Sequence, residues 1–176
     1  MDTQYSLWNF KYLAYCTGTQ IEFNQTSTQI MKKLLSPSTQ AVNFGLLVLR
    51  IGIGIMFILH GQGKMFGGPE KWLKLGGSME DIGITFLPTF WGFMAAFAEF
   101  GGGILLVLGL LFRPACFIML ITMVVAAHVH WVDAAAAGEG LKGKIMEGSH
   151  AIELGILLFA LLFTGPGKYS ADSKLF

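Results

Sequence analysis

Two charged side chains interrupt long apolar stretches of this 176-residue chain, and they are its first candidates for chemistry. Arg50 stands inside the apolar stretch 43–61, and Glu99 stands inside the stretch 86–112. A charge at the centre of a membrane-spanning helix costs about 2.5–3.5 kcal/mol, and an opposite charge beside it offsets much of that cost. A rise of about 1.5 Å per residue puts both charges near mid-membrane if both stretches span it. We therefore expect Arg50 and Glu99 to face the protein interior and to interact, directly or through water or a ligand.

A second group of polar residues gathers at one end of the apolar stretches. Its members are His60, Lys64, His128, His130, Asp133, His150 and Glu153. His150 and Glu153 are three residues apart, so they share one helical face. His128 and His130 alternate, so a helix cannot turn both of them inward. Together with Glu99, the group predicts a polar path that runs from this end into the membrane.

Acid–base and binding roles follow from the residue types on this path. We expect Glu99, Arg50 and Glu153 to be catalytic, and we expect binding by His60, Lys64, His128 and His150. Each residue also has a purely structural alternative. Arg50 and Glu99 could form an ion pair that only stabilises the fold, and Lys64 could extend to lipid headgroups. One of the two alternating histidines could lie at the interface without a role, and His150 could simply hydrogen-bond near a helix start.

Metal or haem binding is not expected. Four-helix di-metal sites repeat Glu-x-x-His on paired helices, whereas this chain has a single His150-x-x-Glu153 in the reverse order. Its two cysteines, Cys16 and Cys116, cannot form a thiolate cage, and no Cys-x-x-Cys-His motif occurs. Nucleotide-binding and nucleophile-elbow motifs are also missing from the sequence.

The composition is that of a membrane protein. Only 13% of the residues are charged, about half of the ~25% usual in soluble domains, and the mean hydropathy is +0.59. With 12 basic and 11 acidic residues, the chain has no charge excess for nucleic acid. The apolar residues come in four stretches, 43–61, 86–112, 114–131 and 149–164, and helices of roughly 17–25 residues span a bilayer.

These stretches predict an all-α integral membrane protein, a four-helix bundle. Four segments cannot close a β-barrel, and open strand edges cannot face lipid. Between the first two spans, the segment 67–83 contains Pro69 and Trp72, which predict a short helix lying at the membrane surface. Arg113-Pro114 predicts a tight turn, and Gly165-Pro166-Gly167 predicts the end of the fourth helix.

Residues 1–42 differ from the rest and form a polar leader ahead of the transmembrane domain, residues 43–173. The first thirty residues lack the pattern of a signal peptide, and Met31-Lys32-Lys33 resembles a natural start. We therefore interpret residues 1–30 as an upstream extension or a dispensable tail. The two lysines before the first span favour a cytoplasmic N-terminus, and an even number of spans then puts the C-terminus on the same side.

Several short motifs, in order, resemble the DoxX family of small bacterial four-helix membrane proteins. They are Leu49-Arg50, Leu59-His60-Gly61 with Lys64-Met65-Phe66-Gly67, Ala98-Glu99-Phe100-Gly101-Gly102, Leu108-Gly109-Leu110 and the closing Gly165-Pro166-Gly167-Lys168-Tyr169-Ser170. The resemblance covers roughly residues 43–173. It implies a location in the bacterial inner membrane, with both termini in the cytoplasm.

The resemblance also implies a function. The family is similar to the membrane subunit of thiosulfate:quinone oxidoreductase and includes members linked to thiol oxidation. We therefore expect a subunit of a quinone-linked oxidoreductase, with a quinone as cofactor and a soluble or membrane redox partner that brings the electrons. The alternative is a non-catalytic anchor, assembly factor or small-solute permeation protein. Either protein could also form homo-oligomers.

Overall fold

The computed structural model describes residues 30–31, 36 and 38–175. The chain divides into two units, residues 1–42 and 43–176. The predictions made for residues 1–30 fall almost wholly outside the described residues. The second unit is helical, and no strand occurs in the described part of the chain.

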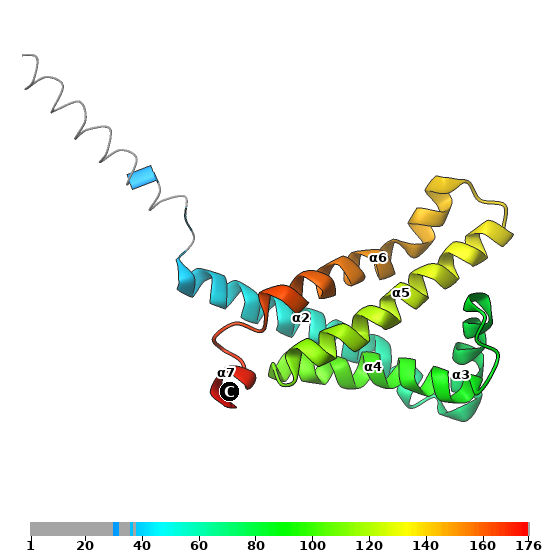
Figure 1. The fold of residues 1–176 in the computed structure, drawn as a ribbon, viewed down its shortest axis with the longest axis horizontal. Coiled ribbons are helices and arrows are strands. Elements are labelled where there is room, and N and C mark those ends of the chain that lie inside the picture. The colour runs from blue at the N-terminus through cyan, green and yellow to red at the C-terminus, as the bar shows by residue number, and fades with distance from the viewer. Residues whose placement is uncertain (1–29, 32–35, 37, 176) are drawn as a thin grey trace, which may run out of the picture. The chain divides into compact units, whose positions relative to one another are not determined.

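Four long helices build the second unit (Figure 1). They are α2 (Thr39–Met65), α4 (Pro88–Leu108), α5 (Phe112–Ala136) and α6 (Leu141–Thr164). Each of the four is long and apolar enough to cross a membrane. The prediction of an all-α bundle with four spans is therefore confirmed. The buried core lies between these helices and includes Phe57, Leu106, Met119 and Leu158.

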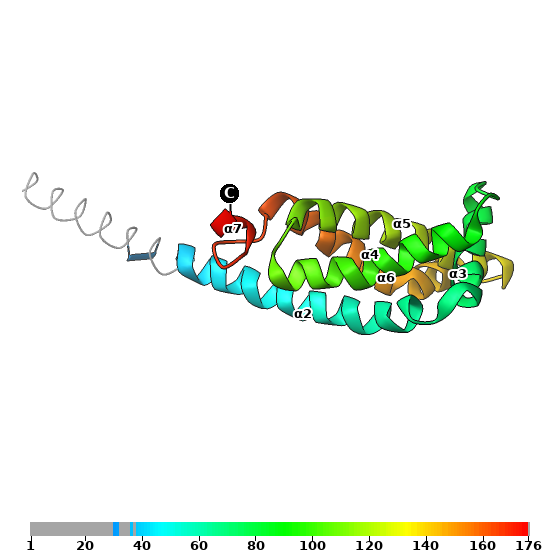
Figure 2. The ribbon, with the colours of Figure 1, turned by 90° about the horizontal axis from the view of Figure 1, so that it is seen from below.

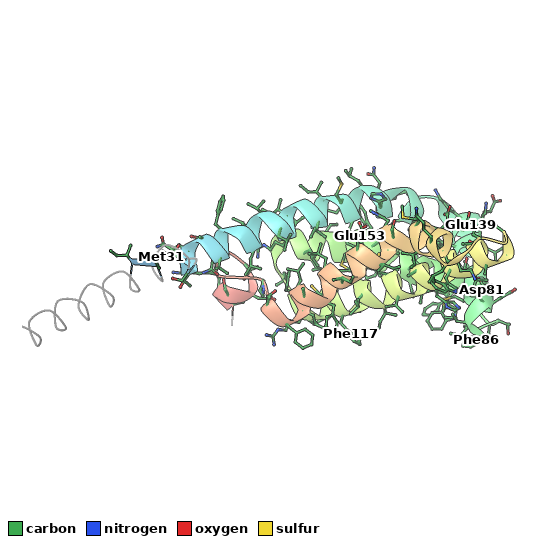
Figure 3. All side chains as sticks on the ribbon, turned by 90° about the horizontal axis from the view of Figure 1, so that it is seen from above. Met31, Asp81, Phe86, Phe117, Glu139 and Glu153 are labelled. Carbon is green, nitrogen blue, oxygen red and sulfur yellow. The ribbon has the colours of Figure 1, made fainter. Side chains whose placement is uncertain are left out.

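The sides of the bundle are covered with apolar side chains. Phe117 on α5 is an example: it projects away from the helices and is 53% exposed (Figure 3). Exposed Val48, Ile121 and Ile156 continue this apolar coat on α2, α5 and α6. In water such a surface would be costly, whereas lipid tails are as apolar as these side chains. The outer surface is thus that of a protein embedded in a bilayer.

The segment after the first span is helical, as predicted, and it also packs tightly on the next transmembrane helix. Helix α3 (Gly68–Gly77) and the 3₁₀ helix η1 (Ser78–Ile82) connect α2 to α4. Helix α3 packs on the first half of α4, where Gly76 meets the Pro88 carbonyl and Gly92 meets the Trp72 carbonyl. Neither glycine has room for a side chain, because each touches the backbone of the other helix.

The loops divide between two ends of the bundle. At one end lie η1 and the α5–α6 connection, where Figure 3 shows Asp81, Phe86 and Glu139 together. At the other end, α4 and α5 meet and the C-terminal helix α7 (Asp172–Leu175) follows α6 (Figure 2). Asn43 near the start of the unit accepts a hydrogen bond from the Lys168 backbone N–H there, at 2.8 Å. Both ends of the unit therefore lie on the same side.

The turn between α4 and α5 comes earlier than predicted. It occupies Gly109–Leu111, with Gly109 at φ +63° as the C-cap of α4, and Pro114 falls in the first turn of α5. A proline suits the first turn of a helix, where its missing N–H is not needed. The predicted stop at Gly165 is confirmed, because α6 ends at Thr164.

Candidate functional site

A cavity of about 120 Å³ lies inside the bundle, toward the end that holds η1 and the α5–α6 connection. Its polar lining residues are His60, Lys64, Glu99, His130 and His150. The rest of its wall is apolar and consists of Met56, Phe57, Met123, Ala126, Ala151 and Leu154. All four transmembrane helices contribute to it. The cavity thus combines a few polar groups with an apolar wall, as small-molecule sites commonly do.

An ion pair closes one side of the cavity. The Lys64 ammonium donates hydrogen bonds to both carboxylate oxygens of Glu99, at 2.6 and 2.7 Å. The Glu99 side chain is 5% exposed and that of Lys64 is 34% exposed. The carboxylate is therefore sealed within the protein, while the ammonium keeps some contact with the outside.

Local sequence explains why these two groups meet. Gly61 lies one turn before Lys64, and a side chain there would come within 2.5 Å of the Phe100 backbone nitrogen. Without that side chain, α2 and α4 approach closely just where Lys64 and Glu99 face each other. Trp72 then donates its indole N–H to the Lys64 carbonyl at 3.0 Å. This bond satisfies a carbonyl at the end of α2 and holds α3 against it.

Three histidines face the same cavity. The rings of His60 on α2 and His150 on α6 lie 5.4 Å apart, centroid to centroid. The Nδ1 atom of His60 lies 2.8 Å from the Met56 carbonyl oxygen. A carbonyl only accepts, so Nδ1 donates here and Nε2 is the acceptor of the neutral ring. His130 reaches the cavity from α5.

Arg50 lies elsewhere, which corrects the expected contact with Glu99. Its guanidinium is buried, as predicted, but it donates to the carbonyl oxygens of Pro166, at 3.3 Å, and Tyr169. The cause is the register of α2 on α4. Gly61 faces Phe100, and Arg50 therefore lies against Gly109 rather than Glu99. The expectation that the two charges meet near mid-membrane therefore does not hold, and α3 rather than the end of α2 covers the first part of α4.

The C-terminal segment that Arg50 holds is also fixed to the start of α5. The Asp172 carboxylate accepts hydrogen bonds from the backbone N–H groups of Leu111 and Phe112, each at 2.9 Å. These N–H groups open α5 and have no partner within the helix. The Gly-Pro-Gly motif and the residues after it thus form a structural clasp, residues 165–175, at the end opposite the cavity.

Four of the seven predicted site residues come together in the cavity: His60, Lys64, Glu99 and His150. Arg50, His128 and Glu153 do not line it. His128 and Glu153 are exposed on α5 and α6, and Figure 3 labels Glu153. The prediction missed His130, which is the member of the alternating pair that lines the cavity. Periodicity alone could have favoured it, because His130 follows the buried Met123 by seven residues, two helical turns.

The described residues contain no group of three or more histidine, cysteine or acidic side chains placed to hold a metal ion. What the cavity offers instead is hydrogen bonding and proton exchange. The imidazole rings can donate and accept hydrogen bonds. Beside them, Lys64 and the buried Glu99 carboxylate supply one further acid and one further base. A small neutral molecule with carbonyl or hydroxyl groups would meet complementary partners there.

Comparisons with known proteins agree with the architecture. The sequence matches the family model described as DoxX over residues 45–131. It is similar to the "Inner membrane protein YqjF" of Escherichia coli, with 34% identity over 134 residues that cover 74% of this chain and 92% of that protein. An uncharacterized protein of Haemophilus influenzae is 33% identical over 129 residues, which cover 73% of this chain and 88% of that protein.

A third relative is an uncharacterized membrane protein of Mycobacterium tuberculosis. It is 33% identical over 133 residues, which cover 72% of this chain and 78% of that protein. No solved structure matches the sequence.

Proposed function

This chain belongs to the DoxX family of membrane proteins, and we propose that it is the membrane subunit of a quinone-linked oxidoreductase whose cavity binds a quinone ring. The observation that carries the proposal is the Lys64–Glu99 pair, which lines one small cavity of a membrane-spanning bundle together with three imidazoles. Ionisable residues inside a membrane are costly and mark substrate or proton pathways.

The volume of the cavity suits a ligand with one six-membered ring. Its volume of about 120 Å³ far exceeds the ~10–15 Å³ that one water molecule needs, and an engineered cavity of about 150 Å³ in another protein holds benzene. Drug-sized ligands occupy about 300–1,000 Å³. A one-ring headgroup therefore suits the cavity better than a fused or multi-ring ligand.

The polar groups match the two carbonyls of a quinone. Lys64 can donate a hydrogen bond to one carbonyl oxygen, and an imidazole N–H of His130 or His150 can donate to another. Glu99 and the histidines can then pass protons toward the exposed side of His60 and His150. The apolar side chains of Phe57 and Leu154 line the cavity and can pack against the ring. When bound, a quinone takes up two electrons and two protons and leaves as a quinol.

The electrons come from outside this chain in our proposal. A small sulfur compound or thiol is the donor: two thiols lose two electrons and two protons as they join in a disulfide. The sequence has only Cys16 and Cys116, and Cys116 is fully buried in the core. We therefore propose a soluble or membrane partner subunit that carries the electrons to the quinone. We place the protein in the inner membrane with both termini in the cytoplasm.

Binding of a quinone analogue to the detergent-purified protein tests the proposal. Wild type is compared with Glu99→Gln, which removes the buried carboxylate, and with Glu153→Gln, which makes the same change at an exposed position outside the cavity. We expect at least a tenfold loss of affinity in Glu99→Gln, about 1.4 kcal/mol, and no change in Glu153→Gln. If folded wild-type protein binds no quinone, a non-catalytic anchor or permeation role replaces this proposal.

A further inference from the structure

A second hollow, of about 350 Å³, lies along α5 and α6 and is lined only by apolar residues. Its lining includes Leu120, Val124 and Ala127 on α5, and Ile152, Ile156 and Phe159 on α6. Val124 is 60% exposed and Ile156 is 67% exposed, so the hollow opens on the surface of the bundle that faces lipid. From position 151 to 159 it follows α6 for about 12 Å, at about 1.5 Å per residue. We call it the lateral groove.

The lateral groove adjoins the polar cavity. Met123 and Ala151 line both hollows, so a single layer of side chains separates them. Methionine has three rotatable bonds and adapts easily to its surroundings. Gly155 also borders this layer, and a Cβ there would be in van der Waals contact with the Met123 Cβ, at 3.7 Å. Met123 and Ala151 are therefore the side chains at which the cavity and the groove meet, between α5 and α6.

We propose that the lateral groove holds the isoprenoid tail of the quinone whose ring occupies the polar cavity, an inference that rests on the proposed function. Such a ligand has a small polar ring at one end and a single apolar chain. The two hollows have the same order: a polar cavity of ring size followed by a purely apolar groove. A phospholipid fits less well, because it offers an apolar chain for the groove but no small ring for the adjoining polar cavity.

The groove adds affinity by tethering rather than by removing the tail from water. Lipid tails are as apolar as the groove, so the tail gains little by leaving the bilayer. A ring already bound in the cavity, however, keeps the tail at a high effective concentration beside the groove. The tail then slows the escape of the ring, and filling the groove should affect only ligands that carry a tail.

Calorimetric titration with two probes separates the two parts of the site. The probes are decylubiquinone, which has a ten-carbon chain, and the same quinone ring without the chain. Val124→Phe fills the groove, and Ile121→Phe is the matched control, since Ile121 lies on the same helix, is also lipid-facing and does not line the groove. Helicity and size-exclusion profiles verify that both variants fold, and Ile156→Phe repeats the test from α6.

We expect Val124→Phe to weaken decylubiquinone binding about tenfold and to leave binding of the tailless ring unchanged, with no effect of Ile121→Phe. Equal losses of affinity for both probes in Val124→Phe would overturn the assignment of the groove. Equal losses of decylubiquinone affinity in Val124→Phe and Ile121→Phe would overturn it too, and neither result would contradict the ring site. Failure of the wild type to bind the tailless ring contradicts the proposed function itself, and this inference falls with it.

Photolabelling tests the same assignment without any variant. A decylubiquinone with a diazirine at the end of its chain should label peptides from 120–127 and 151–159. Labelling elsewhere in the bundle overturns the assignment. Equal labelling of these peptides by a diazirine phospholipid would also overturn it, because the groove would then hold any lipid chain.

Discussion

At the scale of single residues, the fold separates two buried charges that the sequence presents alike. Arg50 and Glu99 both interrupt apolar stretches, and both are buried. Arg50 donates hydrogen bonds to backbone carbonyls of the C-terminal segment, so its role is to stabilise the fold. Glu99 forms an ion pair with Lys64 in the wall of a cavity. The chemistry of the bundle therefore centres on Glu99, and Arg50 belongs to its framework.

Because Glu99 is more deeply buried than Lys64, removing Lys64 should destabilise the protein more than removing the Glu99 charge. Lys64→Met leaves a carboxylate sealed in the protein without its partner, a loss of up to about 3–5 kcal/mol. Glu99→Gln should cost clearly less, because the ammonium is 34% exposed and can turn outward. Reversible unfolding in detergent measures both free energies. The double variant should be more stable than Lys64→Met alone, and a less stable double variant would contradict the pairing.

The sequence identified most of the cavity's polar residues but not how they pair. Charged and histidine side chains inside or just beyond apolar stretches are costly, which made His60, Lys64, Glu99 and His150 recognisable. Pairing depends on helix register, and register is set by contacts such as Gly61 on Phe100. Nothing local in the sequence encodes such a contact, and the expected Arg50–Glu99 pair was wrong for this reason.

At the scale of helices, close backbone approaches decide how the elements meet. Gly54 and Gly103 let α2 and α4 touch, and Gly76 and Gly92 do the same for α3 and α4. Four apolar stretches were enough to predict four spans, whereas the starts of α2 and α6 were not predictable from apolar residues. Helix α6 begins at Leu141, well before the apolar stretch, because polar residues such as Lys142 and Lys144 are also good helix formers.

The α3–α4 contact gives a sharp test of this packing. Gly76→Ala places a methyl group against the Pro88 carbonyl and should destabilise the protein by about 1–3 kcal/mol. The neighbouring Gly77 has nothing within 4 Å of a Cβ. Gly77→Ala should therefore be neutral or stabilise by up to about 1 kcal/mol, through its higher helix propensity. Thermal unfolding of the two variants tests this difference, and Gly76→Ala should melt at the lower temperature. Similar melting temperatures would argue against the contact.

The C-terminal clasp predicts a change in proteolysis. Arg50→Met removes the donor to the Pro166 and Tyr169 carbonyls, so residues 165–175 should detach from the bundle. Trypsin should then cut at Lys168 several-fold faster than in the wild type. Arg113→Met, which removes an exposed charge at the same end, serves as the control and should leave the cleavage rate unchanged. Unaltered cleavage in Arg50→Met would show that the clasp does not depend on this residue.

At the scale of the whole molecule, the cavity and the clasp lie toward opposite ends of the transmembrane unit. With both termini in the cytoplasm, the clasp would lie on the cytoplasmic side and the cavity would lie toward the outer face. A substrate or partner from outside the cytoplasm would then reach the histidines directly. The sequence predicted this membrane character and the four spans, since both follow from composition and block length.

Thiol labelling of intact cells tests this orientation. In a Cys16→Ser background, a cysteine in place of Ser78 on η1 should react with a membrane-impermeant maleimide, because η1 lies at the end opposite the clasp. A cysteine in place of exposed Lys168 should react only after the cells are lysed, while native Cys116 is fully buried. The reverse labelling pattern would place the cavity toward the cytoplasm.

The central claim is that the polar cavity binds a quinone ring, and the two alternating histidines of α5 test it most directly. His130 lines the cavity, whereas His128 does not, and both side chains are exposed. Titration of the purified protein with a tailless quinone ring compares His130→Gln with His128→Gln. We predict that His130→Gln weakens ring binding several-fold and that His128→Gln binds as the wild type does. Equal affinities in the two folded variants, or a greater loss in His128→Gln, would contradict the claim.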